Sequence, residues 1–560
     1  MKPFSKTNIS ILAVIFGLII LSSFFFFRID LTSDKRYSIS KQTKAMMKTV
    51  DEPLDITVYL TGDLNSGFLH LKKSTVEMLN ELNVYSKKNI NIRYENPSEA
   101  TSNEKREENY LKMEMRGMTA TSVYEKDKEG KSIQKIIYPW IEITYKNKTV
   151  PVSLLKNLRG LSGEENLNIS IENLEFELTD AIRQLTASQI SKIAFLEGHG
   201  EFTETETFDI SKSLSKYFQI DRGVIGFDAS ILKDYKAVII AKPMLAFAEK
   251  DKFVIDQYIM NGGRVLWLVD GVQVSQEGFA TIGQSPAIGL DLNLNDILFR
   301  YGVRINSTVL QDVQSSLVPM NVAPKGEKAH FELMPWVFSP LLLTSNEHVI
   351  TRNIAPVKAP FASSVEMVGE LKDVKRNFLI ATSNNTHALQ TPTEISLAEM
   401  PDLKNTQYFN LSYVPVGVVL EGKFPSVFAN RMAPQEILNS TAIKNISEPT
   451  RQIIIACGDV IKNDVEHQGD SIRTLPLGFD RFMNQQFGNR EFITNAVLYL
   501  ADKDGWMNLR NRTVELRLLN KKVASDDRVK WQIINVVIPI LLLLMIGFLY
   551  QFLRKRKYAK

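Results

Sequence analysis

YKAVIIAKP at residues 235–243, EKDKFVIDQYIMNGG at 249–263 and RVLWLVDG at 264–271 form the stretch that decides the fold. The first and third segments are short apolar runs rich in Val, Ile and Leu, typical of strands buried on both faces. The middle segment has the spacing of an amphipathic helix, and Gly262 and Gly263 stand where a helix ends in a left-handed residue. This alternation predicts a parallel sheet covered by helices on both faces.

The same pattern continues on both sides of this stretch. Upstream, KIAFLEGHGE at 192–201 predicts a strand and turn, and TFDISKSLSKYF at 207–218 predicts a helix. Downstream, RQIIIACGD at 451–459 and NREFITNAVLYLAD at 489–502 predict a last strand and a last helix. We therefore expect one α/β domain.

The expected bounds of this domain are 189–502, with a long insertion around 276–450. The inserted part is more irregular, and we expect strands near Val303–Leu310, Asn377–Ala381 and Pro415–Leu420.

A first domain is expected over 28–188. LDITVYL at 54–60 and INIRYENP at 90–97 are β-branched runs, and the segment 69–88 between them has helical spacing. A charged helix at 103–118, strands at Ser122–Lys126 and Ile136–Tyr145, a further strand in KNKTVPVSLL and a helix at Glu172–Leu185 complete the domain. The order β-α-β-α-β-β-α predicts a thioredoxin-like layer without a redox cysteine.

Both ends of the chain carry an apolar run. Ile9 to Phe27 holds no charge, and Ile533 to Leu553 is interrupted only by Asn535, Pro539 and Gln551. Each run is long enough to cross a hydrocarbon core of about 30 Å as a helix. A cleaved signal peptide is the alternative for the first run, and a soluble core helix for the second.

The flanking charges predict the orientation of these two helices. The tail after the second run holds Arg554 to Lys557 and Lys560 without an acid, and Lys2 and Lys6 precede the first run. The positive-inside rule puts both termini in the cytoplasm and the body in the periplasm of a bacterial inner membrane. The expected segments are an N-terminus at 1–8, spans at 9–27 and 531–553, a stalk at 503–530 and a basic tail at 554–560.

Composition and motifs narrow the classes of function. The net charge of +4 in 560 residues does not suggest a nucleic-acid binder. Cys457 is the only cysteine, which excludes an intramolecular disulfide and a CxxC redox pair. The sequence has no GxxxxGK[ST] loop and no GxSxG or HExxH pattern. We therefore expect no cofactor and no enzymatic activity.

The most site-like segment is the GHGE turn at 198–201, which follows a predicted strand. Ligands of open parallel sheets bind at the carboxyl ends of the strands, so His199, Glu201 and Asp270 are candidate ligand-binding residues, and Asp459 follows the last strand in the same way. The alternative is a tight turn whose polar residues cap the following helix. No metal site is expected, because no cluster of His or Cys accompanies these residues.

Several segments together resemble one family, the gliding-motility-associated ABC-transporter auxiliary proteins (GldG-like). The resemblance lies in RIDLTSDKRYSISKQTKAMMKTVDEPLDITVYL at 28–60, FELTDAIRQLT at 176–186, GHGE, DYKAVIIAKP, NGGRVLWLVDG, ELMPWVFSPLL at 332–342, HVITR at 348–352 and REFITNAVLYLADKDGWMNLRNR at 490–512. These segments follow the order of the family, and none is a catalytic motif.

The resemblance implies a non-catalytic accessory, or substrate-binding, subunit that joins an ABC permease and a cytoplasmic ATPase in Bacteroidetes-type bacteria and serves gliding motility. It also implies that the parallel-sheet domain is of the flavodoxin or glutamine-amidotransferase-like kind. Exposed sheet edges would allow a homo- or hetero-oligomer. An envelope carbohydrate- or polymer-binding module and a hydrolase or amidotransferase are the alternative functions.

Overall fold

The computed structural model describes residues 38–126, 132–158, 161–187, 190–323, 327–397, 401–438, 442–469, 471–511 and 527–558. The expected span Ile9–Phe27 lies outside the described residues. The chain divides into two compact units, Met1–Arg512 and Thr513–Lys560. The described part is a mixed α/β body with several sheets, and the second unit holds one long apolar helix.

The first domain is built around a four-stranded sheet with the strand order β2-β1-β5-β6. Strands β1 and β2 are parallel, and β5 and β6 add to β1 in antiparallel fashion. The strands are β1 (Leu54–Val58), β2 (Ile90–Tyr94), β5 (Trp140–Tyr145) and β6 (Lys148–Ser153), with a separate hairpin of β3 (Thr121–Lys126) and β4 (Ser132–Ile137). The single strand expected at Ile136–Tyr145 is therefore two, because Pro139 cannot donate a hydrogen bond to a ladder.

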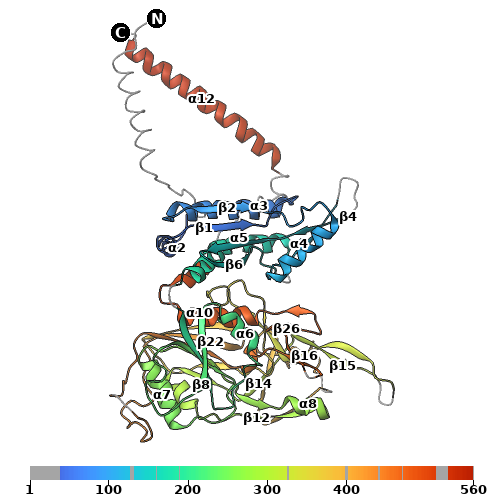
Figure 1. Cartoon of the computed structure of the whole chain (residues 1–560), viewed down its shortest axis with the longest axis vertical. Helices are drawn as coiled ribbons and strands as arrows, with labels where there is room; N and C mark the ends of the chain where they lie inside the picture. The colour runs from blue at the N-terminus through green and yellow to red at the C-terminus, as the bar shows by residue number, and fades with distance from the viewer. Residues whose placement is uncertain are drawn as a thin grey trace. The chain divides into compact units, whose positions relative to one another are not determined.

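Within the described residues, four helices accompany this sheet (Figure 1): α2 (Lys41–Met47), α3 (Ser66–Tyr85), α4 (Asn103–Met115) and α5 (Gly163–Thr186). The Asn65 side chain caps α3 by accepting a hydrogen bond from the Phe68 N–H. Ser162 and Glu165 form a reciprocal capping box at the start of α5. Side chains therefore fix the start of both helices. The apolar faces of α3 and α5 pack against the sheet and form the core of the domain.

The second domain is organised by a ten-stranded mixed sheet. Five parallel strands form its centre in the order β8-β7-β9-β10-β23: β8 (Phe218–Val224), β7 (Ser191–Glu197), β9 (Tyr235–Ala241), β10 (Val265–Leu268) and β23 (Thr450–Ile455). The chain first steps outward from β7 to β8 and then returns to β9 on the other side. The order of winding therefore reverses between β7 and β9, which is the place where ligands of doubly wound sheets bind.

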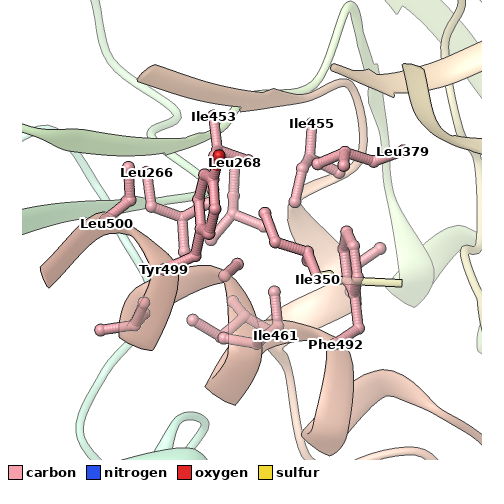
Figure 2. Packing of buried hydrophobic residues seen from close by; sticks show 14 of the residues in the cluster. Leu266, Leu268, Ile350, Leu379, Ile453, Ile455, Ile461, Phe492, Tyr499 and Leu500 are labelled. Carbon is pink, nitrogen blue, oxygen red and sulfur yellow. The ribbon is translucent and has the colours of Figure 1, made fainter. Parts of the chain in front are cut away.

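The two faces of this sheet bury alternate residues, since successive side chains of a strand point in opposite directions. Leu266 and Leu268 join one core and Trp267 joins the other. Helices α6 (Phe208–Leu214) and α10 (Asn489–Ala501) cover the first face, and α7 (Glu249–Met260) and α9 (Asn295–Arg300) cover the second. Figure 2 shows Phe492, Tyr499 and Leu500 of α10 packed against the strands of the first face.

Strands from the segment expected as an insertion extend the same sheet. β22 (Pro415–Gly422) pairs with β23 in antiparallel fashion, and β19 (Val374–Ala381), β16 (Phe331–Thr344) and β15 (Ser315–Asn321) follow outward, with β17 (Val357–Lys358) beside β16. The expected strands at 377–381 and 415–420 correspond to β19 and β22. An antiparallel wing thus extends the parallel strands on one side, and residues of the same segment also form a small hydrophobic cluster of their own, which includes Val309, Phe338 and Phe361.

The remaining elements are short, and two of them, β14 and η1, are buried. They are β11 (Val272–Val274), α8 (Gln276–Ile282), β12 (Gln284–Gly289), β13 (Val303–Ile305), β14 (Thr308–Asp312), β18 (Val365–Met367), β20 (Thr386–Gln390), β21 (Thr393–Ser396), β24 (Val465–Gln468), β25 (Ser471–Thr474), β26 (Phe479–Asp480) and β27 (Gln485–Gln486), with the 3₁₀ helices η1 (Gly458–Ile461) and η2 (Trp506–Asn511). Trp506 of η2 stacks on Phe176 of α5 with ring centroids 5.2 Å apart, so the last segment of the first unit contacts the first domain.

The second unit contains α12 (Arg528–Tyr558). Within the 29 residues from Arg528 to Arg556, the most apolar 18-residue stretch has a mean hydropathy of 2.7, and none of that stretch is buried in the molecule. The helix is therefore long and apolar enough to cross a membrane, as the sequence predicted for Ile533–Leu553. Pro539 lies within it.

Candidate functional site

The GHGE turn lies where the order of winding of the central sheet reverses. It follows β7, and the loop after β9 closes over it. The backbone N–H groups of Met244 and Leu245 both donate to the carbonyl oxygen of His199, at 2.7 and 2.8 Å. Gly200 has a φ of +78°, and a side chain on it would lie 3.2 Å from the Cβ of Met244. A glycine is therefore required for this close approach.

His199 lies between two carboxylates. Its Nδ1 is 3.2 Å from Glu201 Oε1, and its Nε2 is 3.3 Å from Asp251 Oδ2 in the first turn of α7. The Glu201 carboxylate also accepts a hydrogen bond of 2.7 Å from the His199 backbone N–H. The imidazole stacks on the ring of Phe247 at 3.7 Å, and Lys250 pairs with Asp251 at 2.6 Å.

Burial closes this first cluster to solvent. The side chains of His199 and Asp251 are each 8% exposed and that of Glu201 is 1% exposed. Both ring nitrogens face a carboxylate oxygen, so the polar atoms of His199 are engaged within the protein. The arrangement stabilises the turn, and the expected capping role is not seen, because α6 begins without a side-chain cap hydrogen bond.

A second cluster lies at the ends of the next three parallel strands. Lys242, directly after β9, contacts Asp270 at 3.3 Å and makes a short ion pair with Asp459. Asp270, just after β10, accepts a hydrogen bond of 2.5 Å from the Gly458 N–H beyond β23. The side chains of Lys242, Asp270 and Asp459 are 16%, 8% and 5% exposed. One lysine therefore holds the carboxylates of two strands together.

The electrostatics of the second cluster are those of a buried ion triad. Burial alone would lower the pKa of Lys242, but Asp270 and Asp459 outweigh it and hold that pKa above its ordinary value. Burial raises the pKa of Asp270, and Lys242 opposes the rise. Burial also raises the pKa of Cys457 well above its ordinary value. The thiol is fully buried and donates to the Pro360 carbonyl oxygen at 3.2 Å, as expected for an inert cysteine.

The structure thus divides the three predicted site residues between two clusters. His199 and Glu201 lie together, whereas Asp270 belongs to the cluster of Lys242 and Asp459. Within the described part of the chain, no hydrogen bond or ion pair joins one cluster to the other. A ligand-binding role for His199, Glu201 and Asp270 stays a prediction.

Sequence reasoning did not include the partners of these residues. Asp251 lies 52 residues beyond His199, and Lys242 lies 217 residues before Asp459. A usable signal existed for Lys242, because it follows an apolar strand in the same way as Asp270. No such signal marks Asp251, which is one of several charged residues at the start of a helix.

Known proteins place the chain in a family. Residues 191–496 match the model of a family described as an ABC-type uncharacterized transport system, and residues 33–144 match a domain of unknown function. The first match covers more than half of the chain. The chain therefore belongs to this family of ABC-type transport components.

The proteins similar to the chain include one uncharacterized relative and one solved domain of low similarity. An uncharacterized protein of Borreliella burgdorferi is 22% identical over 563 residues, which cover 98% of this chain and 97% of that protein. The mmIFT52 N-terminal domain is 14% identical with a TM-score of 0.32, over 56% of this chain and 99% of that domain.

Proposed function

We propose that this chain is a non-catalytic, membrane-anchored accessory subunit of an ABC transporter complex. The observation that carries the proposal is the family match over residues 191–496, which spans the whole central parallel sheet. The apolar helix α12 supports membrane association of such a subunit. The expected permease and ATPase partners, and the role in gliding motility, belong to this proposal.

The closed sheet edge supports an accessory role over a catalytic one. A catalytic nucleophile must be activated by a neighbouring base and must reach its substrate. Cys457 is buried with a raised pKa, and the polar residues at the strand ends engage one another. Such residues stabilise a surface that can dock a partner protein without turning over a substrate.

The finer fold and topology belong to the same proposal. The order β2-β1-β5-β6 supports a thioredoxin-like first domain, and the order β8-β7-β9-β10-β23 supports a flavodoxin-like or amidotransferase-like second domain. The basic residues after Leu553 support a cytoplasmic tail and a periplasmic body, with the first helix at Ile9–Phe27 returning the N-terminus to the cytoplasm.

Co-purification from the native membrane tests the partner assignment. The full chain, tagged and extracted in a mild detergent, is expected to retain a polytopic permease and a P-loop ATPase. The control variant Lys404→Met changes an exposed residue of the body, leaves the basic tail in place and is expected to retain the same partners. Recovery of the chain without any ABC subunit, after crosslinking in intact cells, would refute the proposal.

Cysteine labelling tests the orientation. The native Cys457 is buried, so it contributes little background. Lys404→Cys places a thiol on the exposed surface of the body, and Lys560→Cys places one in the tail. A membrane-impermeant maleimide is expected to label the first variant in intact spheroplasts and the second only after permeabilisation. The reverse pattern would put the body in the cytoplasm.

A further inference from the structure

A second edge of the central sheet, where the parallel strands begin, holds a cavity of about 340 Å³. It lies at the start of β9 and β10, beside the end of α7. The lining residues include four cations, namely Lys233, Lys236, Arg264 and Lys503, and no aspartate or glutamate. Its volume is at the lower end of the range found for small-ligand sites, about 300–1,000 Å³.

None of these four cations forms an ion pair within the described residues, and the Arg264 Nε is buried without a hydrogen-bond partner. Two carboxylates act on them from a greater distance, Asp228 on Lys233 and Asp502 on Arg264. Lys503 lies close enough to Lys236 to lower the pKa of Lys236, and burial and Arg264 act in the same direction. Neighbouring ammonium groups repel each other, so a site that holds both favours an anion.

Asp502 is the carboxylate that acts on Arg264, and backbone N–H groups also bind its oxygens. Asp502 directly precedes Lys503, but its oxygens accept hydrogen bonds from four backbone N–H groups, at 3.0, 2.9, 3.4 and 3.1 Å, in the turn that leads into η2. The carboxyl-terminal end of α7 adds a negative dipole of about half an elementary charge. That partial charge is far smaller than the charge of four cations.

The larger groove of the domain differs in this respect. Its volume is about 870 Å³, and its lining includes Asp296, Arg300, Arg304 and Arg431. There Arg304 pairs with Glu366, and Asp296 pairs with Lys252. Two of the charged residues in that groove therefore have ion-pair partners, whereas none of the four cations that line the cavity at the start of β9 and β10 forms an ion pair within the described residues.

We propose that the cavity at the start of β9 and β10 binds a phosphate group, carried by a soluble phosphorylated compound or by a lipid headgroup. A divalent oxyanion supplies the missing negative charge to Lys236 and Lys503 at once. The buried Nε of Arg264 offers a donor in the planar geometry that guanidinium groups use for phosphate oxygens. This inference does not depend on the transporter role.

The test measures binding of inorganic phosphate and pyrophosphate to the full chain in detergent, by calorimetry and by the shift in melting temperature. Potassium chloride at equal ionic strength controls for screening. The wild-type chain is expected to bind pyrophosphate more tightly than phosphate. The Lys236→Met, Lys503→Met double variant is expected to lose at least tenfold in affinity.

A matched double variant keeps the charge change the same. Lys212 and Lys404 are exposed and do not line the cavity, so Lys212→Met with Lys404→Met removes two charges elsewhere and should leave binding unchanged. Without ligand, the Lys236→Met, Lys503→Met variant should melt no lower than wild type, because a repulsion is removed. If that variant does not fold, Lys503→Met alone carries the same comparison.

Two results would overturn the inference. The first is a wild-type chain that binds neither phosphate nor pyrophosphate, in nanodiscs or in detergent. The second is equal binding by the cavity variant and the matched control. Nanodiscs of phosphatidylcholine with and without phosphatidylglycerol separate the two sources, since displacement of bound pyrophosphate by the anionic lipid identifies a headgroup.

Discussion

The two edges of the central sheet treat charge in opposite ways. At the carboxyl edge, Lys242 lies between Asp270 and Asp459, and His199 lies between Glu201 and Asp251. At the amino edge, where the parallel strands begin, Lys236 and Lys503 line one cavity, and neither forms an ion pair with a carboxylate of the described residues. The edge where doubly wound proteins usually bind ligands is closed by its own side chains, and the opposite edge leaves a cavity and unmatched charge. The position of a sheet edge in the fold therefore does not decide whether that edge can bind a ligand.

The largest effect is expected from Lys242→Met. The substitution leaves two carboxylates buried without a cation, which typically costs about 3–5 kcal/mol. Urea unfolding of the full chain, followed by tryptophan fluorescence, measures the loss. Lys233→Met at the amino edge is the matched control and should change stability by less than about 0.5 kcal/mol. Equal effects at both positions would remove the distinction between the edges.

A pH effect on folding stability is expected from Asp180 of α5, which lies near the start of β8. Asp180 accepts a hydrogen bond from Tyr217, the residue before β8, and burial raises its pKa to about 6. Because the pKa of Asp180 is higher in the folded than in the unfolded protein, its protonated form stabilises the fold. This stabilisation is complete below pH 3.8 and is lost as the pH rises through about 6.

The free energy of unfolding of Asp180→Asn relative to that of wild type should therefore rise by about 2 kcal/mol between pH 4 and pH 7, since each pKa unit corresponds to about 1.4 kcal/mol and the unfolded carboxyl already titrates near pH 4. Urea midpoints of both proteins at the two pH values measure this difference. A gap that stays constant with pH would show that Asp180 is not protonated in the folded state at pH 4 to 6.

A smaller loss of folding stability, about 2 kcal/mol, is expected from His199→Ala. The change removes the stack on Phe247 and leaves the buried Glu201 and Asp251 without the ring between them. Glu204→Ala, at an exposed position three residues after Glu201, is the control. The same samples, applied to a glycan array, test ligand binding at this turn. A wild-type signal that is lost in His199→Ala would support the predicted ligand-binding role of His199.

The smallest effect is expected from Lys503→Met in the absence of phosphate. Removing one of two facing cations should stabilise the protein by no more than about 0.5 kcal/mol, because Lys503 is exposed. The gain should shrink as salt is added, since screening already weakens the repulsion. A destabilisation at low salt would mean that Lys503 has an anionic partner in the free protein.

Sequence patterns predicted four of the five parallel strands, β7, β9, β10 and β23, because these strands are apolar and buried. They missed β8, an edge strand whose residues are mostly polar and partly exposed. The same patterns placed the GHGE turn and Asp270 at strand ends. The start of α5 at Gly163 was expected nine residues later, although Ser162 and Glu165 carry a capping-box signal. Periodicity alone had identified only the part of the helix that packs on the sheet.

The pairing within the candidate site could not be predicted in the same way. Asp251 and Lys242 lie far along the chain from their partners, and only the order of the strands brings them together. The two clusters share one edge of the sheet, yet each carboxylate is engaged by the cation or imidazole nearest to it. Sequence reasoning therefore placed His199 and Asp270 at the carboxyl ends of the strands, but it did not predict that they would lie in separate clusters.

The pairing of β10 with β23 has a consequence for biosynthesis. Trp267 and its hydrogen-bond partner Gln452 are 185 residues apart, so the centre of the sheet closes late. At roughly 5–20 residues per second, the ribosome needs about 10–40 s to deliver β23 after β10. During that interval one edge of β10 is unpaired, whereas every strand of the first domain has already been made. The second domain is thus the part of the nascent chain most open to aggregation, and the part that most needs protection during synthesis.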